Sequence, residues 1–226
     1  MRKRRYCKKG VFVLLAALVL NTLTYANMIY NFHIFNNPNY ENDLRLNFTL
    51  TTTDEGQNQQ GKNQVGFLFE NSSLIGSSIT AIYFDDGSLL NMNENFLEGQ
   101  GINFSQGATP KSLPAGNTLN PPFDKKPVFS ADSDPPVFHN GINPDEWLKL
   151  VFVLKDNKSY DDVIAEIAAG GSTTCENLRI GIHIQGLPND DSVSAINCTR
   201  SQPIPEPTTI ALLTLGGLVL FRRKSA

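Results

Sequence analysis

The chain has 226 residues, with 19 basic and 22 acidic side chains and a formal net charge of −3. Nine of the basic residues lie in clusters near the two ends, and Glu206 is the single acidic residue outside 27–204. That central part therefore keeps 10 basic and 21 acidic residues, a net charge of −11. Such a charge argues against binding to nucleic acid or to anionic membrane surfaces, because both attract cationic faces. It suits a soluble surface protein in contact with cations or neutral glycans, and the same acidity also keeps an exported domain soluble.

Residues 1–26 are typical of a secretory signal. Six basic residues precede residue 10, and the apolar run Val11 to Leu20 has the length of a signal-peptide core. Thr24-Tyr25-Ala26 offers small residues at the two positions that signal peptidase inspects. We therefore expect signal peptidase to cut after Ala26, and an uncleaved signal anchor is the alternative.

The chain after the signal contains short apolar segments separated by turns. Residues 44–50 alternate apolar and polar side chains with a period of two, which predicts a strand with one face in water. The polar stretch 57–64 predicts a hairpin tip, and Asp85-Asp86-Gly87 predicts a turn after a strand. In this part of the chain we expect strands at 28–35, 44–50, 65–70 and 79–84.

Residues 106–147 hold eight of the chain's 13 prolines, which predicts an ordered loop interrupted by short edge strands. Within this region Asp132 and Asp134 flank Ser133, and hard oxygen ligands close together on a loop suit Ca²⁺. Asp132 and Asp134 are therefore candidate Ca²⁺ ligands. They do not extend to the full twelve-residue Ca²⁺ loop, and capping of a turn is the alternative. We expect no other cofactor.

Two further strands are expected at 148–154 and 178–185, with a helix between them. Ser159 can cap this helix, Asp161 and Asp162 occupy its first turn, and Gly170-Gly171 ends it. Strands in series, hairpin turns and one short helix favour an antiparallel β-sandwich of jelly-roll type. Residues 27–204 are enough for one domain with a core. The apolar stripe of the helix consists of Val163, Ile164, Ile167 and Ala168.

Two cysteines, Cys175 and Cys198, remain once the signal is removed. A pair in an exported domain predicts a disulfide, because the periplasm is oxidising. The bond would close a loop of about 24 residues and contribute on the order of 3 kcal/mol. A metal site is the poorer alternative, since only His183 lies within that loop.

The residue types that carry catalysis are not brought together by their spacing. His33, His139 and His183 lie far apart in sequence, and no Ser or Cys sits in a nucleophile motif such as Gly-x-Ser-x-Gly. We therefore predict that the protein is not an enzyme. A hydrolase remains a further hypothesis, because the two carboxylates of a glycoside hydrolase can lie far apart in sequence and come together only in the folded protein. Exposed aromatic residues can stack on sugar rings, with core packing as the alternative; the candidates are Trp147, Tyr83 and Phe138.

The last 22 residues form a processing and anchoring signal. Pro205 and Pro207 keep the chain extended around Glu206. Thr208 to Phe221 carries no charge and, as a helix, reaches about 21 Å, which is short of a hydrocarbon core of roughly 30 Å. Snorkelling basic side chains or local thinning of the bilayer can cover the difference. We expect a transmembrane helix here, with a cytoplasmic basic end formed by Arg222, Arg223 and Lys224.

This tail resembles the PEP-CTERM sorting signal of Gram-negative bacteria. Pro205-Glu206-Pro207 matches the signature tripeptide, followed in the right order by the membrane segment and the basic end. The resemblance covers about a tenth of the chain. It implies processing by an exosortase near the tripeptide, transit through the inner membrane, and delivery to the cell surface or the extracellular space. Tails of this type are also known as ice-binding protein C-terminal domains, and nothing in these residues supports ice binding. A plain membrane tail anchor is the alternative.

The central part also looks similar to a recurrent type of PEP-CTERM surface protein, which has no established activity. We expect three regions: a signal peptide at 1–26, a β-sandwich body at 27–204 and a sorting tail at 205–226. The predicted role is a structural or adhesive protein of the cell surface or extracellular matrix. A carbohydrate-binding module of the exopolysaccharide matrix is the alternative. The similar segments of the body are 65–71, 132–136, 140–144 and 178–186.

Overall fold

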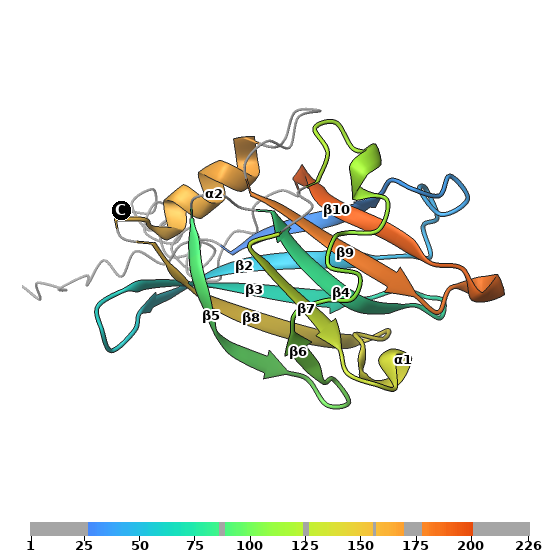
Figure 1. The fold of residues 1–226 in the computed structure, drawn as a ribbon, viewed down its shortest axis with the longest axis horizontal. Helices are drawn as coiled ribbons and strands as arrows, with labels where there is room; N and C mark the ends of the chain where they lie inside the picture. The colour runs from blue at the N-terminus through green and yellow to red at the C-terminus, as the bar shows by residue number, and fades with distance from the viewer. Residues whose placement is uncertain (1–26, 86–88, 124–126, 156, 170–177, 201–226) are drawn as a thin grey trace, which may run out of the picture.

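The computed structural model describes residues 27–85, 89–123, 127–155, 157–169 and 178–200 (Figure 1). These residues form ten strands and two α-helices, so the predicted mainly β fold is confirmed. The helices are α1 (Val137–Asn140) and α2 (Tyr160–Ala169). The strands are β1 (Met28–Ile34), β2 (Phe48–Gln57), β3 (Asn63–Asn71), β4 (Ser78–Asp85), β5 (Leu90–Glu98), β6 (Phe104–Gln106), β7 (Phe129–Ser133), β8 (Glu146–Leu154), β9 (Arg179–Gln185) and β10 (Val193–Arg200).

The strands of the described ranges form one antiparallel sheet that curls on itself. Their order is β5-β8-β3-β2-β1-β10-β9-β4-β7-β6. The two halves of the sheet face each other, since the Phe84 ring on β4 lies 5.1 Å from the Phe67 ring on β3 and 4.9 Å from the Phe152 ring on β8, centroid to centroid. Phe129 on β7 also lies 4.9 Å from Phe152. Two of these pairs are edge-to-face and the Phe84–Phe152 pair is tilted. Such ring contacts stabilise the fold beyond the area that they bury, and they place the main core between the halves. The predicted jelly-roll connectivity is not established by this order and stays a prediction.

The outer faces of the two halves differ. We call β10, β9, β4 and β7 the covered half of the sheet, and residues 107–123 the proline-rich loop. On the outer face of the covered half, Ala81 and Tyr83 pack with Leu113 and Phe123 of this loop in a second hydrophobic cluster. We call β5, β8, β3 and β2 the exposed half, and on its outer face Leu97 and Trp147 are each 41% exposed. The burial of the strands differs in the same way. Every residue of β4 except its last is buried, whereas buried and partly exposed residues alternate towards the end of β3.

Most predicted strands are present, but the one predicted at 44–50 is wrong in its first four residues. Asp43 Oδ1 accepts a hydrogen bond from the backbone N–H of Arg45 at 3.0 Å, which makes a turn, and Leu44 is 95% exposed. β2 begins only at Phe48 and continues through Thr51–Thr53, whose β-branched side chains suit a strand. The turn predicted at Asp85 does not open a hairpin, because β4 pairs with β7 and β9, and β5 pairs with β8.

The predicted helix is confirmed as α2. Ser159 and Asp162 cap it reciprocally: the Ser159 N–H donates to Asp162 Oδ2 at 2.7 Å, and the Asp162 N–H donates to Ser159 Oγ at 3.4 Å. The Tyr160 hydroxyl donates to the Thr52 carbonyl oxygen at 2.8 Å, and Val163 is fully buried. α2 is thereby fixed at one end of the sheet, and α1 lies at the other (Figure 1).

Candidate functional site

The residues predicted to direct processing lie outside the described ranges. They are Ala26, Pro205, Glu206, Pro207, Arg222, Arg223 and Lys224. The same holds for the expected signal helix and the expected transmembrane helix; within the described ranges, no helix is long and apolar enough to cross a membrane. Cys175 also lies outside them, so its disulfide with Cys198, a residue of β10, stays a prediction.

The strands nearest to the two predicted processing points are neighbours. β1 begins at Met28, two positions after Ala26, and β10 ends at Arg200, five positions before Pro205. The two strands are paired in antiparallel register, with Arg200 opposite Tyr30. The chain therefore enters and leaves the curled sheet through adjacent strands at one end.

The two candidate Ca²⁺ ligands lie on either side of Ser133, the last residue of β7. Asp132 Oδ2 accepts a hydrogen bond from the backbone N–H of Thr109 at 3.1 Å, and burial raises the pKa of the Asp132 carboxyl. The Asp134 carbonyl oxygen accepts a hydrogen bond from Asn140 Nδ2 at 2.9 Å. Among the described residues, no three His, Cys, Asp or Glu side chains gather in a group that could hold a metal ion. Asp132 thus fastens the proline-rich loop to β7, and Ca²⁺ binding by the pair stays a prediction.

His183 lies on β9 in a row of polar side chains that crosses the covered half. Its Nδ1 is 3.4 Å from Ser194 Oγ on β10, and burial lowers the pKa of the imidazole. On the other side of His183 the row continues with Ala81 on β4 and then Asp132 on β7. Within this described row Ala81 separates His183 from the carboxylate, so the arrangement lacks the Ser–His–Asp chain that a hydrolytic triad needs.

A buried arginine that sequence reasoning missed holds the proline-rich loop in place. The Arg179 side chain is 8% exposed and forms an ion pair with Asp85. The guanidinium also donates to the carbonyl oxygens of Pro121 and Pro122 at 2.6 and 2.7 Å, and it lies 5.2 Å from the centre of the Phe123 ring. A planar guanidinium suits this combination of several acceptors and an aromatic face. The one signal in the sequence was a charged residue in the otherwise apolar run 178–182.

The three aromatic residues considered for sugar stacking have different surroundings. Tyr83 is buried, and its hydroxyl donates to the Pro110 carbonyl oxygen at 2.9 Å, so core packing is its role. Phe138 on α1 is 50% exposed and lies against Gly186. Trp147 lies on the exposed half with Glu70 directly opposite on β3. Trp147 and Phe138 therefore present ring surface to solvent, and Trp147 does so beside a carboxylate.

Comparison with known proteins identifies the tail. Residues 203–224 match the family model described as the PEP-CTERM protein-sorting motif, which takes in both the predicted tripeptide and the basic end. Beyond this match, the chain matches no curated protein and no solved structure. The match covers about a tenth of the chain, so it identifies the tail and not the activity of the β-rich body. This chain is therefore a protein that carries a PEP-CTERM sorting motif, at residues 203–224.

Proposed function

We propose that this chain is an exported protein that an exosortase processes near Pro205-Glu206-Pro207 and delivers to the cell surface or the extracellular matrix. There the body acts without catalysis, as a structural or adhesive protein. The observation that carries the proposal is the match of residues 203–224 to the PEP-CTERM protein-sorting motif. The structural or adhesive role of the body goes beyond what this match covers, and the antiparallel β-rich fold supports it.

The processing route has three parts. Signal peptidase removes residues 1–26, the segment 208–221 spans the inner membrane as a helix during transit, and the exosortase then cuts at the tripeptide. The pairing of β1 with β10 supports this route, because both cuts fall near strand ends that are already joined to each other. The disulfide between Cys175 and Cys198 forms after export in this proposal, and the central 27–204 remains as the mature domain.

Several features of the described residues support a role without catalysis. The polar row through His183 is interrupted by Ala81. Two pockets of about 410 and 380 Å³ have no Asp or Glu among their described lining residues, which does not favour the carboxylate pair of a glycoside hydrolase at either place. Ca²⁺ at Asp132 and Asp134 would serve to fix the loop after β7, and no reaction step is assigned to it.

The test is the mass of the intact protein from secreted and membrane fractions, in strains with and without a functional exosortase. We expect a species that begins near Asn27 and ends near Pro205 only where the exosortase works. A species that keeps residues 208–226 in both strains would identify a plain tail anchor and overturn the sorting proposal. Mature protein confined to the cytoplasm would overturn the surface role.

A second candidate function is carbohydrate binding, favoured by the position of Trp147. Trp147 is 41% exposed on the exposed half, and Glu70 opposite it on β3 can accept hydrogen bonds from sugar hydroxyls. A glycan array measures this directly. We expect binding that Trp147→Ala removes and that Phe138→Ala, at the other exposed aromatic ring, leaves unchanged. An array without signal at high protein concentration would exclude the candidate.

A further inference from the structure

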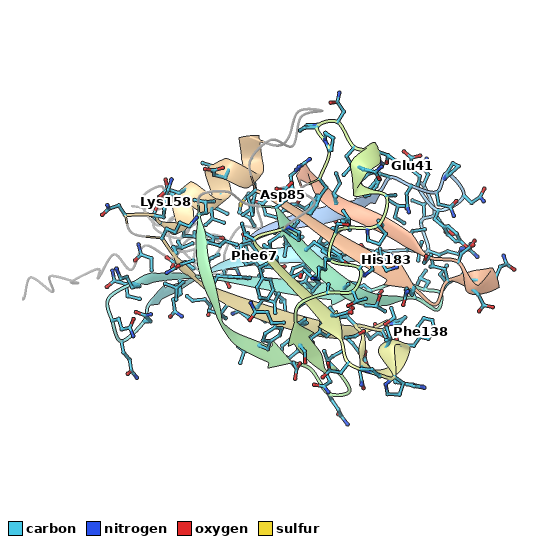
Figure 2. All side chains as sticks on the ribbon, viewed as in Figure 1. Glu41, Phe67, Asp85, Phe138, Lys158 and His183 are labelled. Atoms are coloured by element: carbon cyan, nitrogen blue, oxygen red, sulfur yellow. The ribbon has the colours of Figure 1, made fainter. Side chains whose placement is uncertain are left out.

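An aromatic ring and a carboxylate lie side by side on the outer face of the exposed half. Side chains of a strand alternate between the two faces of a sheet, and Phe67 of β3, labelled in Figure 2, is fully buried in the core. Glu70 is an odd number of positions further along β3, so it lies on the outer face. Trp147 of β8 is directly opposite Glu70, and side chains paired in this way have Cβ atoms about 5 Å apart.

The indole of Trp147 is held against the backbone that follows β5. A Cβ at Gly99 would lie 3.4 Å from Nε1 and 3.5 Å from Cε2 of the ring. The Gly99 N–H also donates to the Trp147 carbonyl oxygen at 3.1 Å, which keeps the two segments together. One edge of the indole therefore rests on Gly99, while Trp147 as a whole stays 41% exposed. A ring supported in this way loses little conformational freedom when a ligand stacks on it.

The lysine nearest to Glu70 on this face is directed away from it. Lys149 is opposite Leu68, midway between Gly66 and Glu70 along β3. Its Cε would lie 2.5 Å from a Cβ at Gly66, so the lysine stem crosses β3 where no side chain stands, and its Nζ pairs with Glu55 at 2.6 Å. Within the described ranges, the Glu70 carboxylate forms no hydrogen bond and no ion pair. Its charge is therefore available to a ligand.

The row that contains these two side chains favours a cation with hydroxyl groups. Thr49 of β2 is opposite Glu70 on its other side and is partly exposed. Strands lie about 4.8 Å apart, so Trp147, Glu70 and Thr49 form a line about 10 Å long across three strands. A carboxylate beside an indole attracts a positive charge, because the face of the ring is electronegative. The net charge of the domain has the same sign, with 10 basic and 21 acidic residues in 27–204.

We propose that this row binds a cationic amino-sugar chain, with a pyranose ring stacked on Trp147, its ammonium group on Glu70 and a hydroxyl group of the chain on Thr49. The inference rests on the second candidate function, carbohydrate binding, and names the class of sugar. A neutral glycan would cover the Glu70 carboxylate without neutralising its charge, which costs free energy. A lysine side chain of a partner protein would match Glu70 but would bring neither a ring for Trp147 nor a hydroxyl group for Thr49.

Calorimetric titration of the full-length protein in neutral detergent tests the proposal. The cationic probe is the glucosamine tetramer, and the neutral probe is the N-acetylglucosamine tetramer, which has the same rings without the charge. We expect the glucosamine tetramer to bind about tenfold more tightly or better, because a hydrogen bond to a charged group is the stronger kind. Its binding should weaken as the salt concentration rises.

Two matched variants assign this preference to Glu70. Glu70→Gln removes the charge and keeps an acceptor oxygen, so it should remove most of the difference between the two tetramers while binding of the neutral one stays unchanged. Glu166→Gln on α2 removes one negative charge at a distance from the row and should leave both affinities unchanged. A loss of glucosamine binding that is equal in Glu70→Gln and Glu166→Gln would overturn the site.

Further outcomes separate this inference from the functions proposed above. Equal affinities for the two tetramers, both lost in Trp147→Ala, would support carbohydrate binding and overturn the assignment to an amino sugar. The lysine tetrapeptide, titrated in parallel, carries positive charge without sugar rings, and binding as tight as that of the glucosamine tetramer would also overturn it. Absence of glucosamine binding would do the same. The mass of the processed protein tests sorting independently of all these titrations.

Discussion

The covered half and the exposed half of the sheet share one core but use their outer faces differently. On the covered half, Arg179, Tyr83 and Asp132 each hold the proline-rich loop against the strands. On the exposed half, Trp147 and Leu97 are partly exposed, and the ion pair of Lys149 with Glu55 lies at the surface, with side chains 21% and 25% exposed. The covered half therefore packs against the core on its inner face and against the loop on its outer face. The outer face of the exposed half is accessible to other molecules.

This difference predicts that substitutions on the outer faces of the two halves have different effects. A substitution on the outer face of the covered half should act on stability, because a loop is packed there and its polar groups have protein partners. An equivalent substitution on the exposed half should leave stability nearly unchanged and act on binding. Paired substitutions, one in each half, therefore test the comparison.

The largest expected difference in stability is that between two ion pairs, one in each half. Arg179→Ala removes the buried guanidinium from partly buried Asp85 and from two loop carbonyls, and we expect it to lower the free energy of unfolding by about 3–5 kcal/mol. Lys149→Ala breaks the more exposed pair with Glu55 and should cost about 1 kcal/mol or less. Urea unfolding of the full-length variants measures both values. Equal losses would show that the loop is not held by Arg179.

Two glycines at outward positions give the next comparison. A Cβ at Gly181 would lie 2.6 Å from Leu113 Cδ2, a buried atom of the packed loop, and Gly181→Ala should cost about 1–3 kcal/mol. A Cβ at Gly66 on the exposed half would meet Glu55 Oε1, Lys149 Cε and Thr53 Oγ1, each at 2.5 Å. The Glu55 and Lys149 side chains are long enough to turn away, and the Thr53 hydroxyl can move only by a change of χ1 rotamer. Gly66→Ala should therefore cost less than Gly181→Ala, about 1 kcal/mol or less.

A compensating variant checks the reason for the Gly181 effect. Leu113→Ala removes the atoms that the new methyl group would contact. If Gly181→Ala costs less in the Leu113→Ala background than in the wild type, as measured by urea unfolding, the contact with the loop is the cause. Strictly additive losses would place the cause elsewhere.

Removal of a single hydroxyl should give a smaller difference. Tyr83→Phe deletes the hydrogen bond to the Pro110 carbonyl oxygen and should cost about 1 kcal/mol. Trp147→Phe shortens a half-exposed ring on the exposed half and should stay within about 0.5 kcal/mol of the wild type. Thermal unfolding followed by circular dichroism separates the two. A larger loss for Trp147→Phe would contradict the accessibility of that face.

The sequence predicts the strands whose pattern is carried by apolar side chains. β1, β3, β4, β8 and β9 lie where alternating or continuous apolar residues place them, and α2 lies where its cap and acidic first turn indicate. β5 escapes prediction because its sequence, Leu-Asn-Met-Asn-Glu-Asn, is rich in Asn, a residue that strands disfavour. β10 also escapes, since Ser194 and Asn197 interrupt its apolar residues, and only pairing with β1 and β9 makes it a strand.

The sites depend even more on contacts between distant parts of the chain. Arg179 and Asp85 are 94 positions apart and meet because β4 and β9 pair, a long-range event that no local pattern reveals. Asn63 and Lys158 likewise lie on two segments that only the fold brings together, and Asn63 Nδ2 donates to the Lys158 carbonyl oxygen at 2.8 Å. The sorting motif is the opposite case, because its pattern lies in consecutive residues and needs no fold to assemble it, so the sequence alone was sufficient to identify it.

The smallest expected effect concerns pH and the covered half. Burial lowers the pKa of His183, so the folded protein keeps this imidazole neutral at a pH where the unfolded chain, with a pKa near 6.5, takes up a proton. The unfolded state then binds more protons, and the folded state loses stability as the pH falls through about 6.5. His183→Gln removes this contribution, and the urea midpoint should fall less between pH 7.5 and 5.5 than in the wild type. His139→Gln, on exposed α1, is the control. An unchanged pH dependence in His183→Gln would show that solvent reaches the imidazole, and that the proline-rich loop leaves this part of the face accessible.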